Sequence, residues 1–97
     1  MRTSVVTLVS LGRLPEERSA LASHLQAFED ALKAIEPPVT DAEAASLLDV
    51  LPSTEGSCFG LAWSVLHLIE SAPGWPIKDA ELHRSNPWVA SMLERAR

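Results

Sequence analysis

The sequence predicts an all-α fold: a compact bundle of about four to five helices around one central apolar helix at about residues 57–72. Apolar residues recur at spacings of three and four along most of the chain, which is the period of a helix face. Seven prolines divide these stretches into short segments, because proline disrupts a helix interior. With 97 residues, 46% of them hydrophobic and 22% charged, the chain has the size and composition of a single globular domain over residues 1–97.

The first segment, residues 3–11, fits either a helix or a strand. Val5, Leu8 and Val9 lie on one helix face, but one face of a strand made of Val5, Thr7, Val9 and Leu11 fits equally well. No other segment alternates clearly at a period of two, so a strand here would have no partner. We therefore expect a short helix that ends at Gly12.

The clearest helical pattern follows Pro15. Proline suits the first turn of a helix, and Glu16 and Glu17 would lie near the positive end of the helix dipole. An apolar stripe follows at spacings of four, three, four and three, made of Leu21, Leu25, Phe28, Leu32 and Ile35. We expect one helix from Pro15 to the Pro37-Pro38 pair.

Two helices are expected in the middle of the chain. Thr40 and Glu43 have the spacing of a capping box, which predicts a helix that runs to about Leu51. Ser57 is expected to cap the next helix, which runs to about Ala72. Apolar residues cover most of the circumference of this second helix, so we expect neighbours on several sides of it.

The C-terminal segment begins with a short turn, for which Asp79 is the expected cap. Asn86 and Pro87 then give a strong start signal, with asparagine at the cap and proline at the first position. Arg95 and Arg97 would lie at the negative end of this last helix. Its apolar stripe consists of Trp88, Val89, Met92 and Leu93.

Two stretches carry a resemblance to known proteins. The expected helices at 41–51 and 57–72 resemble one hairpin of the HEAT kind, which occurs here once, whereas HEAT proteins repeat it. The stretch from Cys58-Phe59-Gly60-Leu61-Ala62-Trp63 to Trp75-Pro76 is similar to segments of small uncharacterised bacterial proteins. The first resemblance implies two stacked antiparallel helices, and the second implies no activity.

The net charge of −5 is concentrated in the middle of the chain. Between Lys33 and Lys78 there is no lysine or arginine, but there are Glu36, Asp41, Glu43, Asp49, Glu55 and Glu70. An acidic segment repels phosphate groups, so we expect neither nucleic acid nor a membrane surface as a partner. A basic protein is the expected partner. The residues expected to contact it are Asp41, Glu43, Asp49, Glu55 and Trp75.

Trp75 has two interpretations, because it lies in a loop between glycine and proline. It either folds back onto the core as a lid or stands out as a hydrophobic anchor for the partner. The acidic segment also has an alternative, as a solvated face that keeps the protein soluble. A homodimer that buries part of the central helix stays open as well.

His67 is the candidate for a ligand pocket. Trp63 precedes it by four residues and Glu70 follows it by three, so the three side chains share one side of the expected helix. A histidine beside a carboxylate and an aromatic ring can act as a general base or contact a ligand. The alternative is that His67 fills a gap beside a neighbouring helix, since no nucleophile or oxyanion donor is identifiable near it.

The sequence does not support a thiol dyad, a metal site or a phosphate-binding loop. Cys58 and His67 would lie on opposite faces of one helix, so they cannot form a thiol dyad. His24, His67 and His83 lack the spacing of a metal-binding helix, and no phosphate-binding glycine loop is present, so we expect no metal or cofactor. A single cysteine cannot form an intrachain disulfide, and charged residues interrupt any signal-peptide pattern, which favours a cytoplasmic location.

Two functions remain. The favoured one is a non-enzymatic protein-binding module, accessory or immunity-like, that uses its acidic surface. The alternative is a small enzyme or ligand-binding protein with a pocket near Trp63, His67 and Glu70. No catalytic residue is identified. The exposure of these three side chains separates the two hypotheses, because a concave pocket lined by them favours the second.

Overall fold

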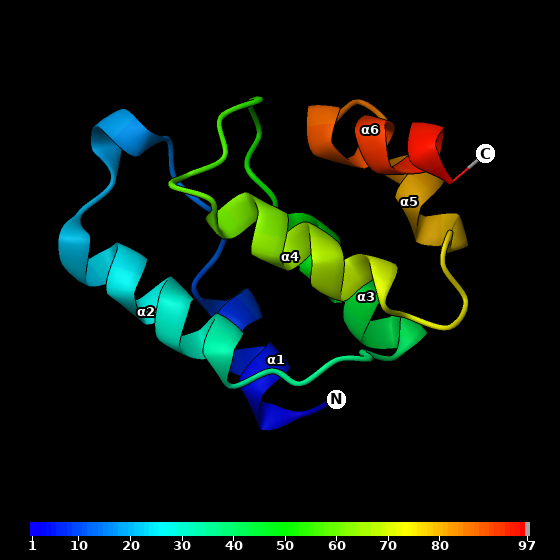
Figure 1. Cartoon of the computed structure of the whole chain (residues 1–97), viewed down its shortest axis with the longest axis horizontal. Helices are drawn as coiled ribbons and strands as arrows, with labels where there is room; N and C mark the ends of the chain where they lie inside the picture. Colours follow the sequence, from blue (N-terminus) through cyan, green and yellow to red (C-terminus); the bar gives the residue numbers. More distant parts are fainter. Residues whose placement is uncertain (97) are drawn as a thin grey trace.

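The computed structural model describes residues 1–96, and this part of the chain contains α-helices and 3₁₀ turns but no strand. The α-helices are α1 (Thr3–Ser10), α2 (Ala22–Lys33), α3 (Asp41–Leu47), α4 (Leu61–Glu70), α5 (Lys78–Leu82) and α6 (Pro87–Arg95) (Figure 1). The 3₁₀ turns are Glu17–Ser19 and Leu48–Val50. The predicted all-α fold is confirmed, with six α-helices in the described residues instead of four to five.

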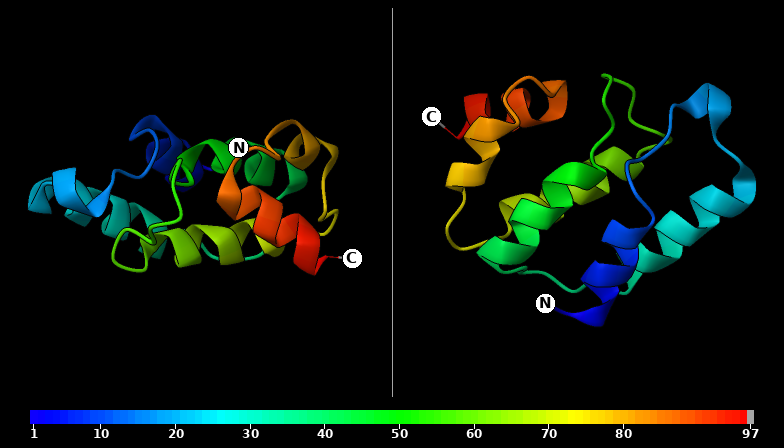
Figure 2. Two further views of the ribbon diagram at one scale, coloured as in Figure 1. Left: turned by 90° about the horizontal axis from the view of Figure 1, so that it is seen from above. Right: turned by 180° about the vertical axis from the view of Figure 1, so that it is seen from behind.

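Helix α4 lies in the middle of the molecule, between α2 and α6 (Figure 1). It packs against α2, α3 and α6, and the view from behind shows α3 alongside it (Figure 2). All six helices contribute buried apolar side chains to one core. The largest fully buried ones in the α-helices are Leu8, Phe28, Leu47, Leu66, Ile69 and Met92.

The ambiguous first segment forms helix α1, as expected. Val5 and Leu8 are fully buried, which accounts for the helical spacing of the apolar residues. Gly12 follows the helix with a φ of 86°, a left-handed conformation that glycine adopts without steric cost.

The helix expected from Pro15 begins later, at Ala22, and this boundary was wrong. Residues Glu17–Ser19 form a single 3₁₀ turn, and the chain is extended at Leu21, whose side chain is 69% exposed instead of lying in the apolar stripe. The physical reason is a tertiary contact, because the Glu17 Oε1 atom accepts the N–H of Phe59 at 3.0 Å. A continuous helix would not leave the turn free to reach the loop before α4.

The predicted capping box is present at the start of α3. Thr40 Oγ1 accepts the N–H of Glu43 at 3.1 Å, and Glu43 Oε1 accepts the N–H of Thr40 at 2.9 Å. The helix ends at Leu47 and continues as a 3₁₀ turn, Leu48–Val50, instead of reaching Leu51 as an α-helix. The N–H of Val39 donates to Ser71 Oγ at 3.1 Å, so the start of α3 lies beside the end of α4 and the two helices are antiparallel.

The predicted start of the central helix at Ser57 was wrong, since α4 begins at Leu61. Ser57 Oγ instead accepts the N–H of Gly60 at 3.2 Å. Cys58, Phe59 and Gly60 have φ values of 51°, 55° and 87°, a left-handed turn that separates Ser57 from the helix. No local pattern predicts this turn, because cysteine and phenylalanine rarely adopt positive φ.

Helix α4 is buried on one side only. Val65, Leu66 and Ile69 are buried against the neighbouring helices, whereas Trp63 is 47% exposed and His67 is exposed. Helix α4 has the expected neighbours in α2, α3 and α6, and it leaves Trp63 and His67 on the side that they do not cover. Within residues 1–96, no helix has the length and apolar character that a membrane crossing requires.

The last helix has the predicted cap. Asn86 Oδ1 accepts the N–H groups of Trp88 at 2.9 Å and Val89 at 3.3 Å, and Pro87 occupies the first position. The short helix α5 differs, because Ile77 occupies its cap position and Asp79 lies in its first turn without capping it. Arg97, which was expected at the end of α6, lies outside the described residues.

Helices α4 and α6 run in the same direction (Figure 1). Trp63 near the start of α4 contacts Trp88 near the start of α6, and Glu70 at the end of α4 pairs with Arg95 at the end of α6. The long connection after α4 allows this parallel arrangement.

Candidate functional site

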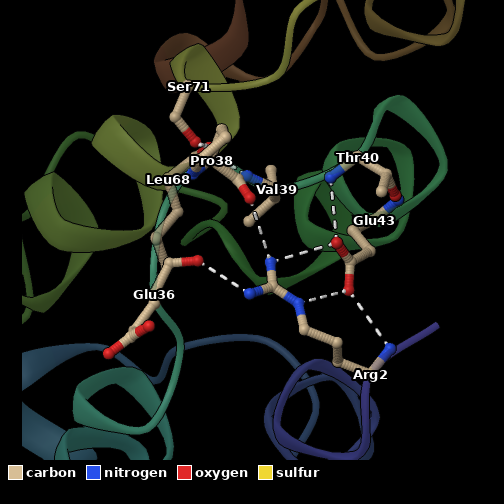
Figure 3. A network of polar contacts seen from close by, with 8 residues as sticks. All are labelled: Arg2, Glu36, Pro38, Val39, Thr40, Glu43, Leu68 and Ser71. Atoms are coloured by element: carbon tan, nitrogen blue, oxygen red, sulfur yellow. Dashed lines mark hydrogen bonds and ion pairs between the residues drawn. The ribbon is translucent and has the colours of Figure 1, made fainter.

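Glu43, one of the carboxylates expected to face a partner, is instead buried, with 1% of its surface exposed. Its Oε2 atom accepts the Arg2 Nε–H at 3.0 Å, and its Oε1 atom accepts the Arg2 Nη2–H at 3.1 Å (Figure 3). The Arg2 hydrogen bond and then the Thr40 amide lower the pKa of Glu43 from 4.5 to about 2, against the opposing effect of burial. Glu43 therefore acts within the fold and does not reach a partner.

The Arg2 guanidinium joins three parts of the chain. Beyond its pair with Glu43, Nη1 donates to the Glu36 carbonyl at 2.7 Å and Nη2 donates to the Pro38 carbonyl at 3.3 Å (Figure 3). The start of α1, the connection before α3 and the first turn of α3 are thereby held together. This cluster is a structural network, because the Arg2 guanidinium and the Glu43 carboxylate both bond to other parts of the same chain.

Asp41 and Asp49 are exposed, but each makes a contact inside the fold. Asp41 Oδ1 accepts the N–H of Gly74 at 2.8 Å. Asp49 Oδ1 lies 3.1 Å from His83 Nε2, and the other ring nitrogen of His83 lies 3.0 Å from the Asp79 carbonyl oxygen. Both carboxylates therefore fix a loop or a helix end in addition to their place on the surface.

Glu55 differs from the other three expected carboxylates. It is exposed in the loop between the Leu48–Val50 turn and α4, and it makes no hydrogen bond or ion pair with residues 1–96. Its negative charge is therefore uncompensated within the described part of the chain.

Trp75 packs back onto the fold. Its side chain is partly buried against the hydrophobic core. Its backbone N–H donates to the Ala72 carbonyl at 3.0 Å. Of the two interpretations of this residue, the placement corresponds to the lid and not to a projecting anchor.

Trp63, His67 and Glu70 do not form a common pocket. The Glu70 carboxylate accepts a hydrogen bond from Arg95 Nη2 at 2.7 Å, so it is engaged away from His67. His67 is exposed, and its ring centroid lies 6.4 Å from that of Trp63 in a tilted arrangement. The geometry therefore lacks the histidine–carboxylate pair that a general base at this position would use.

A different pocket adjoins Trp63, where the Glu55 loop, α4 and α6 meet. It has a volume of about 250 Å³ and is lined by Glu55, Trp63, Pro87, Trp88 and Ser91. The indole rings of Trp63 and Trp88 meet edge to face, with centroids 5.0 Å apart and an interplanar angle of 85°. We call this site the tryptophan pocket.

The walls of the tryptophan pocket are held in place by hydrogen bonds from α6 to the loop. Trp88 Nε1 donates to the Thr54 carbonyl at 2.9 Å, and Asn86 Nδ2 donates to the Pro52 carbonyl at 2.9 Å. The first bond fixes the Trp88 ring and the residue directly before Glu55 at the same time. The fold itself therefore holds the Trp88 ring and the Glu55 loop in position.

Cys58 is not placed for chemistry. Its side chain is 1% exposed, and burial, followed by the charge of Glu17, raises the pKa of its thiol. A raised pKa lowers the fraction of thiolate, which is the reactive form.

The sequence pointed to Trp63 and Glu55 separately and did not bring them together. Trp88, the third wall of the pocket, was assigned to the apolar stripe of α6, and it is indeed 7% exposed. The three residues come from segments with no common spacing, so no sequence pattern could have found the site. Comparison of the chain with protein-family models, with curated proteins and with solved structures gives no match.

Proposed function

We propose that this protein is a non-enzymatic, cytoplasmic protein-binding module of the accessory or immunity-like kind, and that its partner is a basic protein. The observation that carries this proposal is the segment 55–63, which directs one carboxylate and two aromatic side chains toward solvent. Glu55 is unpaired within residues 1–96, Phe59 is 66% exposed and Trp63 is 47% exposed. Exposed aromatic residues are typical of the energetically important positions in protein interfaces.

Phe59 supports the proposal through its backbone. Its φ of 55° follows a φ of 51° at Cys58, and non-glycine residues in such conformations cost about 1–3 kcal/mol each. The exposed Phe59 side chain returns little burial energy to offset this cost. The Glu17 carboxylate nevertheless holds the turn by accepting the Phe59 N–H, so the fold maintains an arrangement that displays an aromatic ring.

The charge distribution indicates a basic partner. The net charge is −5, and no lysine or arginine occurs between Lys33 and Lys78. Complementary charge increases the rate at which proteins associate and rejects partners of the same sign. The enzymatic alternative loses its main support, because Glu70 is engaged by Arg95 and not by His67.

The test is affinity capture followed by binding kinetics with the captured partner. Glu55→Lys combined with Phe59→Ser should abolish capture, and Glu55→Lys alone should lower the association rate of the purified partner and the dependence of that rate on salt. Asp30→Lys on α2 is the matched control, since it makes the same charge reversal at an exposed site away from the 55–63 segment. A captured partner that is acidic, or one that binds the double variant and wild type equally, would contradict the proposal.

A further inference from the structure

We infer that the tryptophan pocket accepts one arginine side chain of the partner, with its guanidinium beside the indole of Trp63 and its charge met by Glu55. This inference rests on the proposed function, because it assigns the part of the basic partner that this site recognises.

The size of the pocket suits a single side chain. Its volume of about 250 Å³ lies below the roughly 300–1,000 Å³ of sites that hold drug-sized molecules. The lining residues are Glu55, Trp63, Pro87, Trp88 and Ser91, and none of them is basic. An occupant that is long, partly apolar and positively charged complements this lining.

The two tryptophans favour a cation. The face of an aromatic ring carries partial negative charge, and tryptophan is the strongest partner for a cation among the aromatic side chains. Trp63 is half-exposed, so a partner's side chain can reach its ring, whereas Trp88 is 7% exposed and forms the inner wall. Because Trp88 is already fixed by its bond to the Thr54 carbonyl, little ordering of the site is needed on binding.

Glu55 favours arginine over lysine. A guanidinium can form two parallel hydrogen bonds to a carboxylate while its plane stacks on an aromatic ring. Lysine presents a strongly hydrated point charge and loses more on leaving water. No group within residues 1–96 neutralises Glu55, so the incoming cation does not have to displace an internal ion pair.

An anion is disfavoured, although the pocket lies at the start of helix α6. Helix starts attract anions through their free N–H groups. Here Pro87 has no N–H, and the N–H groups of Trp88 and Val89 donate to Asn86 Oδ1. Arg95, one turn beyond Ser91 on the same helix, is held by Glu70 and does not fill the pocket.

The direct test is a nuclear magnetic resonance titration of ¹⁵N-labelled protein with N-acetyl-L-arginine amide. The indole N–H signals of Trp63 and Trp88 should shift saturably at millimolar concentrations, while that of Trp75 serves as an internal reference. N-acetyl-L-citrulline amide has nearly the same shape without the charge and should bind roughly tenfold more weakly, and the lysine analogue should bind more weakly than arginine. Equal shifts with arginine and citrulline, or none at Trp63, would overturn the inference.

Variants locate the site. Trp63→Leu removes the ring at a half-exposed position without changing the net charge, and Glu55→Gln removes only the charge; each should weaken arginine amide binding by about fivefold or more. Asp30→Asn removes an exposed carboxylate on α2, outside the pocket, and should leave the affinity unchanged. Circular dichroism and the Trp75 signal verify that each variant folds. Wild-type affinity in both pocket variants would refute the assignment.

Affinity capture with the Trp63→Leu variant as bait tests this inference separately from the proposed function. A basic partner bound equally well by wild type and Trp63→Leu, together with no response to arginine amide, would refute the pocket and leave the proposed function standing. Arginine amide binding without capture of any basic protein would instead refute the proposed function. Loss of both the partner and arginine amide in Trp63→Leu is the result expected.

Discussion

The ion pair between Arg2 and Glu43 makes stability depend on pH in a defined direction. Replacing Glu43 with glutamine keeps the size and much of the hydrogen-bonding capacity of the side chain but removes its charge. The carboxyl has a pKa of about 2 in the folded chain against an ordinary value of 4.5, so folding favours its charged form by about 3 kcal/mol. Because 40% of the Arg2 side chain is exposed and partly screened, we expect Glu43→Gln to lower the free energy of unfolding at pH 7 by about 2–3 kcal/mol.

The effect should shrink in acid. A carboxyl whose pKa is lowered by folding contributes its full stability above the unfolded pKa of about 4.5, and that contribution disappears as the pH falls toward about 2. At pH 3 the folded carboxyl is still charged while the unfolded one is largely protonated. The difference between wild type and Glu43→Gln should therefore fall to about 1 kcal/mol.

Urea denaturation at pH 7 and pH 3, followed by circular dichroism, measures both values. Glu29→Gln is the control, because Glu29 forms an exposed i,i+4 pair with Lys33 that is worth only about 0.3–0.5 kcal/mol. A loss in Glu43→Gln that equals the loss in Glu29→Gln would refute the reasoning, as would a loss that is the same at both pH values.

Three further predictions concern the core and the loops. Leu66→Ala should lower the free energy of unfolding by about 2–5 kcal/mol, since Leu66 is 1% exposed, and an unchanged urea midpoint would show that α4 is peripheral. Gly74→Ala should cost about 1 kcal/mol, because the new Cβ would lie 2.1 Å from Asp41 Oδ2 and the carboxylate must leave the Gly74 N–H. An undiminished loss in an Asp41→Ala background would contradict that cause. The Cys58 thiol should react with Ellman's reagent much more slowly in the folded protein than in urea, and immediate labelling of the native protein would show that it is accessible.

The features that the sequence predicted well are those whose determinants lie within a few residues. The box of Thr40 and Glu43 and the cap of Asn86 are complete within four residues, and both are present in the fold. Helical periodicity identified the buried faces of α1 and α6 for the same reason, since each face is specified by its own segment.

The features that it missed depend on contacts between distant residues. The sequence predicts Glu43 both as a capping carboxylate and as a surface charge, because nothing near it indicates Arg2, 41 residues away. The late start of α2 follows from the bond between Glu17 and Phe59, which are 42 residues apart. The partial exposure of Trp63 and its place in a pocket depend on where α6 packs, which no local pattern encodes.

The two hydrogen bonds from α6 to the preceding loop have a consequence for local unfolding. Asn86 and Trp88 each bind a loop carbonyl, at Pro52 and Thr54, so neither segment can detach without breaking both bonds. Segments coupled in this way open as one cooperative unit. Trp63 belongs to α4, outside that unit, so a side chain bound in the tryptophan pocket bridges the unit to the centre of the molecule. Occupancy of the pocket would then slow amide hydrogen exchange throughout α6, far beyond the residues that touch the ligand.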